Sequence, residues 1–183
     1  MRRLAAILSA ALAAALAAVL SAFPAGAALK PGAQAPDFSA RASLGGKEFD
    51  FSLAEALSRG PVVLYFYPAA FTPGCTIEAH AFAEAIDKYK ALGASVIGVS
   101  SDDIATLNKF SVSECRSKFP VAADADKTIM TAYDARLALG YANRTSYVIA
   151  PDGRIIYEYT ALDPSQHVAN TLDALQRWKA GQK

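Results

Sequence analysis

Hydrophobic and polar residues follow two different periods along the chain, and these periods predict an α/β protein. Two runs, 62–66 (VVLYF) and 95–99 (SVIGV), are short and almost continuously apolar, which is typical of strands buried on both faces of a sheet. On the segment 76–92, apolar residues at helical spacing predict a buried face that includes Ile77, with Glu84 on the opposite face. The other predicted helices are 104–114, 164–179 and a short one within 130–139.

A hairpin is predicted in the last third of the chain. Pro151-Asp152-Gly153 is a strong turn signal between two strand-like segments, 145–150 and 155–159. Gly45-Gly46 indicates another turn. Two strand–helix units followed by an antiparallel pair are the order of a thioredoxin-like fold, with a central mixed sheet flanked by helices. The same periodicity fits a flavodoxin-like sheet almost as well. The segment after the first strand is therefore needed to distinguish between the two folds.

The N-terminal segment differs in composition from the rest of the chain. Arg2 and Arg3 precede an apolar stretch at 4–20, and Ala25-Gly26-Ala27 has the small-x-small pattern of a signal-peptidase site. We therefore expect residues 1–27 to be a signal peptide and residues 28–183 to form one exported domain, most simply a periplasmic one. The alternative is an uncleaved membrane anchor, because the apolar stretch is near the lower limit of about 17 residues for a span.

Charge and cysteine content exclude several classes of function. Lys and Arg number 18 against 17 Asp and Glu, so no nucleic-acid or anionic-lipid partner is expected. The chain has two cysteines and neither a Cys/His array with zinc-ligand spacing nor a glycine-rich phosphate loop, so we expect no metal or other cofactor. In an exported protein the two cysteines could be reactive, form one structural bridge or be inert.

Cys75 stands where a thiol becomes a nucleophile. The pattern Pro68-x-x-x-Thr72-x-x-Cys75 runs from a predicted buried strand through a predicted loop, 67–74, into the first turn of a helix. Free amide groups and the helix dipole at this end favour the thiolate, which is the reactive form. The Thr72 hydroxyl could orient the sulfur or a substrate, and Pro68 could shield the sulfur from water. A lone buried cysteine is more often an inert apolar residue, but this setting favours a reactive one.

The segment around Cys75 resembles a known family. Pro68, Thr72 and Cys75 match the active-site motif of peroxiredoxins, and the segment 62–79 is similar to the peroxiredoxin Q (bacterioferritin comigratory protein) subgroup. The resemblance extends over roughly residues 30–160 and includes the segments 32–38, 96–100 and 144–153. It implies a thioredoxin fold with added elements. It also implies a cofactor-independent peroxidase that reduces hydrogen peroxide and small organic hydroperoxides through a sulfenic acid at Cys75.

The resemblance gives further residues a role. It implies that Arg144 stabilises the Cys75 thiolate and the charge that builds on the peroxide, and that Glu78 braces this arginine. A solvated helix acid is an equally good interpretation of Glu78. Aromatic residues around the motif could form the rim of a peroxide pocket or belong to the core: these are Tyr65, Phe66, Tyr67 and Phe71. In the last helix, His167 and Trp178 give no signal beyond packing and surface.

The chain departs from the subgroup where the sulfenic acid would be resolved. Many members carry a second cysteine five residues after the first, whereas this chain has His80, which the helical pattern predicts to be an exposed surface residue. Cys115 lies forty residues after Cys75, and the resemblance implies a Cys75–Cys115 disulfide that a thioredoxin-like donor reduces. Such a bond requires the two Cα atoms to approach within about 7 Å. A one-cysteine cycle resolved by an outside thiol is the alternative.

Two other classes of function compete with the peroxidase. An exported thiol–disulfide oxidoreductase would share the fold, but it would need a Cys-x-x-Cys motif, and Glu78 occupies the position of the second cysteine. A non-catalytic binding module would hold the two cysteines in a permanent bridge. For the peroxidase we expect a monomer or weak dimer with no stable membrane association once the signal is removed.

Overall fold

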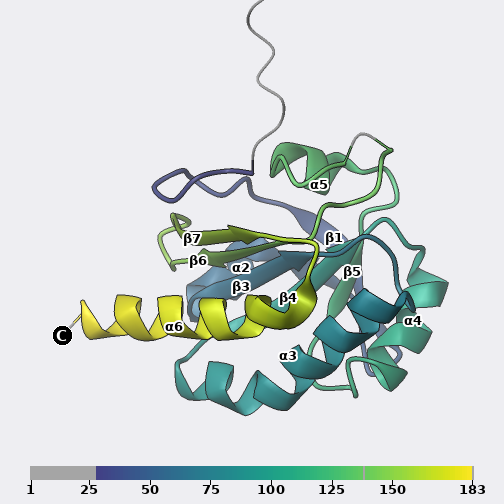
Figure 1. Cartoon of the computed structure of the whole chain (residues 1–183), viewed down its shortest axis with the longest axis horizontal. Coiled ribbons are helices and arrows are strands. Elements are labelled where there is room, and N and C mark those ends of the chain that lie inside the picture. The colour runs from purple at the N-terminus through teal and green to yellow at the C-terminus, as the bar shows by residue number, and fades with distance from the viewer. Residues whose placement is uncertain (1–27, 138, 183) are drawn as a thin grey trace, which may run out of the picture.

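A seven-stranded mixed sheet forms the centre of the computed structural model, which describes residues 28–137 and 139–182 (Figure 1). The predicted signal peptide lies outside these residues. The strand order is β2-β1-β5-β4-β3-β6-β7. The strands are β1 (Ser39–Leu44), β2 (Lys47–Ser52), β3 (Val62–Phe66), β4 (Ser95–Ser100), β5 (Val121–Ala123), β6 (Thr145–Ile149) and β7 (Ile155–Thr160). The helices are α2 (Leu53–Arg59), α3 (Pro73–Ala91), α4 (Ile104–Ser113), α5 (Thr128–Ala132) and α6 (His167–Ala180), with a 3-10 turn at Pro164–Gln166.

The central strand β3 divides the core into two layers. It pairs in parallel with β4 and antiparallel with β6, and all five of its residues are buried. Val62, Leu64 and Phe66 point into a cluster with α2 and α5, whereas Val63 and Tyr65 point into a cluster with α3, α4 and α6. Figure 1 shows the latter three helices in front of the sheet. The predicted thioredoxin-like fold is confirmed.

The strands predicted from apolar runs agree with the structure to within a residue, but helix α3 differs from its prediction in two ways. It begins at Pro73, three residues before the predicted start, because proline fits the first helical position. Its buried face is also rotated. Ile77, predicted to be buried, is 58% exposed, while the neighbouring Glu78 is completely buried. Burial of this acid is possible because Arg144, the residue directly before β6, supplies a charged partner.

The short helix predicted within 130–139 lies earlier, at Thr128–Ala132. The buried Asp124 carboxylate accepts hydrogen bonds from the Ile129 and Met130 amides at 3.0 and 2.8 Å, which fixes the start of α5. Asp134 has a left-handed backbone with φ 51°, which is incompatible with continuing the helix. The prediction placed this helix too late because the Asp124 hydrogen bonds that fix its start lie outside the apolar pattern.

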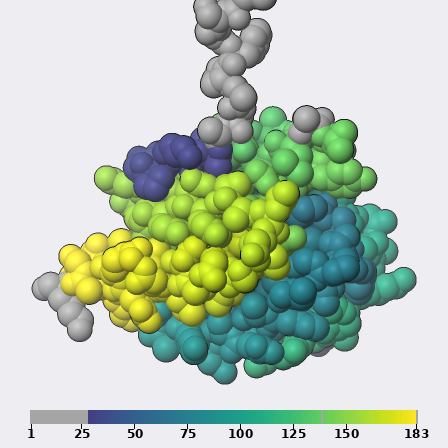
Figure 2. Space-filling model, in the orientation of Figure 1, coloured from purple at the N-terminus to yellow at the C-terminus, as the bar shows by residue number. Residues whose placement is uncertain are grey.

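Helix α6 closes the face of the molecule that carries α3. In Figure 2 the C-terminal residues, in yellow, lie against the teal residues of the central part of the chain. Ala174 and Leu175 of α6 belong to the same apolar cluster as Cys75. The 3-10 turn that precedes α6 also contacts α3. None of the described helices is long and apolar enough to span a membrane.

Candidate active site

Cys75 is the third residue of α3 and is 1% exposed. Two hydrogen bonds hold the loop that leads to it from β3: the Tyr67 amide donates to the Val99 carbonyl at 3.1 Å, and the Ala70 amide donates to Asp102 at 2.7 Å. This loop directs the chain so that the sulfur sits in the first helical turn. Amide groups there lack partners within the helix and stabilise negative charge.

Arg144 directly precedes β6, and three partners fix its guanidinium. Nε donates to the Leu162 carbonyl at 2.8 Å, Nη1 donates to the Glu78 carboxyl group, and Nη2 lies 3.5 Å from the Cys75 sulfur. The residue is 4% exposed. A buried cation this close to the sulfur attracts negative charge strongly, because little water is present to weaken the attraction.

Glu78 and Gly74 complete the surroundings of the arginine. Because Glu78 is fully buried, the interpretation of this residue as a solvated helix acid is wrong. Burial raises the pKa of Glu78 to about 8, while Arg144 acts in the opposite direction. Sequence reasoning gave Gly74 no role beyond the loop. A Cβ atom there would lie only 3.0 Å from Arg144 Nη2, so a larger residue would crowd the guanidinium.

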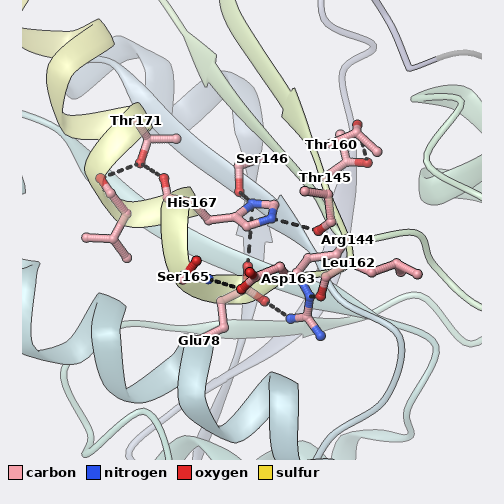
Figure 3. A network of polar contacts seen from close by, with 12 residues as sticks. Glu78, Arg144, Thr145, Ser146, Thr160, Leu162, Asp163, Ser165, His167 and Thr171 are labelled. Carbon is pink, nitrogen blue, oxygen red and sulfur yellow. Dashed lines mark hydrogen bonds and ion pairs between the residues drawn. The ribbon is translucent and has the colours of Figure 1, made fainter.

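Behind Glu78 lies a buried polar network that the sequence analysis missed (Figure 3). His167, the first residue of α6, is fully buried, with Nε2 at 2.9 Å from the Ala161 carbonyl oxygen and Nδ1 at 2.8 Å from Ser146 Oγ. Nδ1 also lies 3.6 Å from Glu78 Oε1. Burial lowers the pKa of His167 to about 4, so its neutral form is favoured. A single histidine at a helix start carries no local sequence signal for such a position.

The other residues singled out around Cys75 divide between the loop and the core. The Thr72 hydroxyl donates to the Ala69 carbonyl at 2.9 Å, which leaves its oxygen lone pairs free to accept. Tyr65 and Tyr67 are buried on the same face of the sheet as Cys75. Phe66 points to the opposite face, so of the two interpretations it fits the one that makes it a core residue. Phe71 is 47% exposed on the loop.

Cys115 lies two residues beyond α4 and is fully buried as a free thiol. It belongs to the same apolar cluster as Cys75, and burial raises the pKa of its thiol. The two residues that follow, Arg116 and Ser117, both have left-handed backbones, with φ 51° and 54°. This cysteine therefore sits in a tight, strained turn rather than within a helix.

His80, at the position where many relatives carry the second cysteine, connects the two cysteine segments. Its Nε2 lies 2.9 Å from Glu114, the residue before Cys115, and its side chain is 38% exposed. His80 was predicted to be an exposed surface residue. Its side chain is partly exposed, but the prediction did not include the contact with Glu114.

The described residues contain no group of three or more His, Cys, Asp or Glu side chains that could hold a metal ion. The site consists of a thiol, a guanidinium and a carboxyl group, all buried. This arrangement can stabilise a sulfur anion and direct it at an electrophile. A cysteine so placed on a thioredoxin-like fold defines a thiol-based redox protein.

Comparisons with known proteins give the family. The AhpC/TSA family matches residues 31–158. A putative chloroplastic peroxiredoxin Q of Oryza sativa subsp. indica is 35% identical over 151 residues, which are 81% of this chain and 67% of the rice protein. The crystal structure of peroxidoxin BcpB from Mycobacterium tuberculosis superposes with a TM-score of 0.75 at 30% identity, covering 81% of this chain and 97% of that one. Peroxiredoxin Q from Xanthomonas campestris gives a TM-score of 0.67 at 25% identity, covering 76% and 90%. The chain belongs to the AhpC/TSA family, as the resemblance predicted, and is a thiol-dependent peroxidase of the peroxiredoxin type.

Proposed function

We propose that the protein reduces hydrogen peroxide and small organic hydroperoxides with Cys75 as the attacking group. The Arg144 Nη2 atom 3.5 Å from the sulfur is the observation that carries this assignment. The thiolate attacks one peroxide oxygen, the O–O bond breaks, and the leaving oxygen takes up a proton to become water or an alcohol. Cys75 is left as a sulfenic acid. Arg144 and the free amides of α3 stabilise the charge on both sulfur and oxygen.

Thr72 and Pro68 have positions that suit the roles implied by the family motif. The Thr72 hydroxyl uses its hydrogen on Ala69, so its oxygen is available to accept a hydrogen bond from a peroxide. Pro68 is partly buried on the loop that leads into α3, and in the proposed cycle it limits the access of water to the sulfur. Glu78 acts through Arg144, whose guanidinium it orients.

We further propose that Cys115 resolves the sulfenic acid. Its thiol condenses with Cys75–SOH, releasing water and forming a disulfide that a thioredoxin-like thiol donor reduces. Both thiols are free and share one apolar cluster, which supports their pairing. Because Cys115 is fully buried, its turn has to open before the two sulfur atoms meet.

Single-turnover mixing of the reduced protein with one equivalent of hydrogen peroxide tests this cycle. We expect a loss of about 2 Da and of both thiols, abolished by Cys75→Ser, because two hydrogens leave as the disulfide forms. Cys115→Ser should instead gain about 16 Da as the sulfenic acid accumulates. A gain of that size in the unmodified chain, with Cys115 still free, would replace the two-cysteine cycle with a one-cysteine cycle. No rapid reaction at Cys75 would overturn the peroxidase assignment.

We also propose that residues 1–27 direct export and that the mature protein acts in the periplasm as a monomer or weak dimer. The basic start, apolar stretch and small-x-small site support this proposal. Expression of the full chain in a Gram-negative host, followed by intact mass of the periplasmic fraction, tests it. We expect a mature chain that begins at Ala28. A full-length mass in the membrane fraction would make the segment an anchor instead.

A further inference from the structure

The hydrogen bonds of His167 determine which ring nitrogen carries a hydrogen. Nε2 lies 2.9 Å from the Ala161 carbonyl oxygen, which can only accept, so Nε2 is the donor. Nδ1 faces two oxygen atoms, Ser146 Oγ at 2.8 Å and Glu78 Oε1 at 3.6 Å. A neutral His167 therefore presents its Nδ1 lone pair to both of them.

Glu78 meets this lone pair with an unsatisfied oxygen. Its Oε2 atom accepts from Arg144, whereas Oε1 is buried with no hydrogen-bond partner among the described residues. A negatively charged oxygen facing a lone pair in a dry interior is unfavourable. One proton on either group removes the conflict: a protonated carboxyl group turns no negative charge toward Nδ1, and an Nδ1–H directs a positive charge at the carboxylate oxygen 3.6 Å away.

We propose that Glu78 and His167 share one proton at neutral pH, so that the charge of Arg144 remains available to the Cys75 thiolate. With this proton the pair is neutral overall, and the guanidinium and thiolate balance one another. Without it, the site would hold one positive and two negative charges in a buried space, and the thiolate would be the group destabilised. His167 is thus a positioning residue that acts through Glu78. The inference rests on the proposed function, in which Cys75 is the attacking group.

The surroundings of the pair agree with this assignment. The charged groups that face His167 are Arg144 and the exposed Asp163, which shift the stability of its charged form in opposite directions. On its other side the Tyr159 ring packs edge-on at 4.8 Å and offers no charge. Burial raises the pKa of Glu78 and lowers that of His167, so each prefers its uncharged form. This difference puts the proton mainly on the Glu78 carboxyl group.

Glu78→Gln tests the proposal most directly. Glutamine imitates the protonated acid, because it is uncharged, its carbonyl can accept from Arg144, and its amide nitrogen takes the place of Oε1 beside Nδ1. In a Cys115→Ser background, alkylation of the single remaining thiol is measured with iodoacetamide as a function of pH. We expect the midpoint of the profile to stay within about 0.3 pH unit of the parent. A fall of about one unit or more, tenfold faster alkylation below the midpoint, would mean that a carboxylate had been removed and would overturn the proposal.

His167→Asn provides the converse test. Its amide donates an N–H near the position of Nδ1 without needing the shared proton, so Glu78 can ionise. We expect the alkylation midpoint to rise by about one unit, and adding Glu78→Gln to return it to the parent value. A midpoint unchanged by His167→Asn would contradict the assignment. Thr171→Val is the matched control: this buried hydroxyl, one turn along α6, pairs with Tyr89 and should leave the midpoint unchanged.

The proton can also be observed without a variant that alters the fold around His167. A protonated-carboxyl band in the infrared spectrum that disappears in Glu78→Gln, or an imidazolium signal from His167 in the nitrogen NMR spectrum, supports the shared proton. The absence of both at neutral pH would refute it. The chain has only two histidines, which makes the NMR assignment simple. If Cys75 failed to react with peroxide, the proposed function would fall, while these measurements would still decide the proton question.

Discussion

Glu78→Gln should change how the stability of the protein depends on pH. Burial raises the pKa of Glu78 from 4.5 to about 8, so the folded state holds this proton more tightly than the unfolded chain. The contribution of Glu78 to stability is therefore complete below pH 4.5 and is lost as the pH rises through about 8. His167 has the opposite sign. Its pKa falls from 6.5 to about 4, so its contribution is complete above pH 6.5 and is lost as the pH falls through about 4.

The two groups give a window in which Glu78 acts alone. Between pH 4.5 and 6.5 their slopes offset each other. Between pH 6.5 and about 8 only Glu78 binds protons differently in the two states. Each pH unit there lowers the free energy of unfolding by about 1.4 kcal/mol, so the total loss is about 2 kcal/mol. Glu78→Gln lacks this titration, and the stability difference between parent and variant should shrink by the same amount.

Urea unfolding followed by circular dichroism, at intervals between about pH 6 and pH 9, measures that difference. Titration of the thiols is common to both proteins and cancels. Glu84→Gln, the same substitution at an exposed position of α3, should give a difference that varies much less with pH. A parent-minus-variant difference that stays flat from pH 6.5 to 8 would refute the reasoning, because it would mean that Glu78 is an ordinary carboxylate whose charge Arg144 has stabilised.

Four further substitutions test other parts of the structure. Arg144→Lys keeps the charge, but a lysine cannot bind the Leu162 carbonyl, Glu78 and the sulfur together. The second-order rate constant with hydrogen peroxide should therefore fall by about 10²-fold in stopped-flow measurements. An unchanged rate constant would rule out the proposed role of Arg144 in peroxide reduction. Tyr65→Phe removes a buried hydroxyl that has no partner among the described residues and should cost no stability in urea unfolding. Tyr133→Phe loses a 2.7 Å hydrogen bond and should cost about 1 kcal/mol; equal effects would contradict this contrast. His80→Ala removes the 2.9 Å contact with Glu114 in the segment before Cys115 and should speed disulfide formation after peroxide addition by about twofold to fivefold. Slower formation would show that this contact does not hold the turn closed.

Apolar runs made the centre of the fold predictable, whereas the edge strands lacked this signal. β3 and all but the first residue of β4 are buried, so their sequences are almost continuously apolar. β1 and β2 were not predicted, although their turn was. β1 buries only Ala42 and Ser43, and the latter pairs with the Ser111 hydroxyl at 3.1 Å. Small and polar residues of this kind form a strand because neighbouring strands provide partners, which no local period records.

The active site was predictable to the extent that it is local in sequence. Cys75 was found from its motif, and the resemblance placed Arg144 beside it. The burial of Glu78 and the role of His167 depend on α3, β6 and α6 meeting at one point, and the Arg144–Glu78 pair alone joins residues 66 positions apart. No helical period predicts a buried acid, because its partner comes from another element.

The turn after Cys115 bears on how long the oxidised enzyme remains vulnerable. Two consecutive non-glycine residues in the left-handed region cost at least about 2 kcal/mol together, and this energy is released when the turn opens. In the proposed cycle the open form is about 30-fold more populated than it would be with an unstrained turn. The sulfenic acid is then captured sooner, before a second peroxide can oxidise it to the irreversible sulfinic state. Glycine in place of Arg116 and Ser117 would relax the turn. Less of the sulfenic acid would then form the disulfide, and more of it would be oxidised to the sulfinic acid.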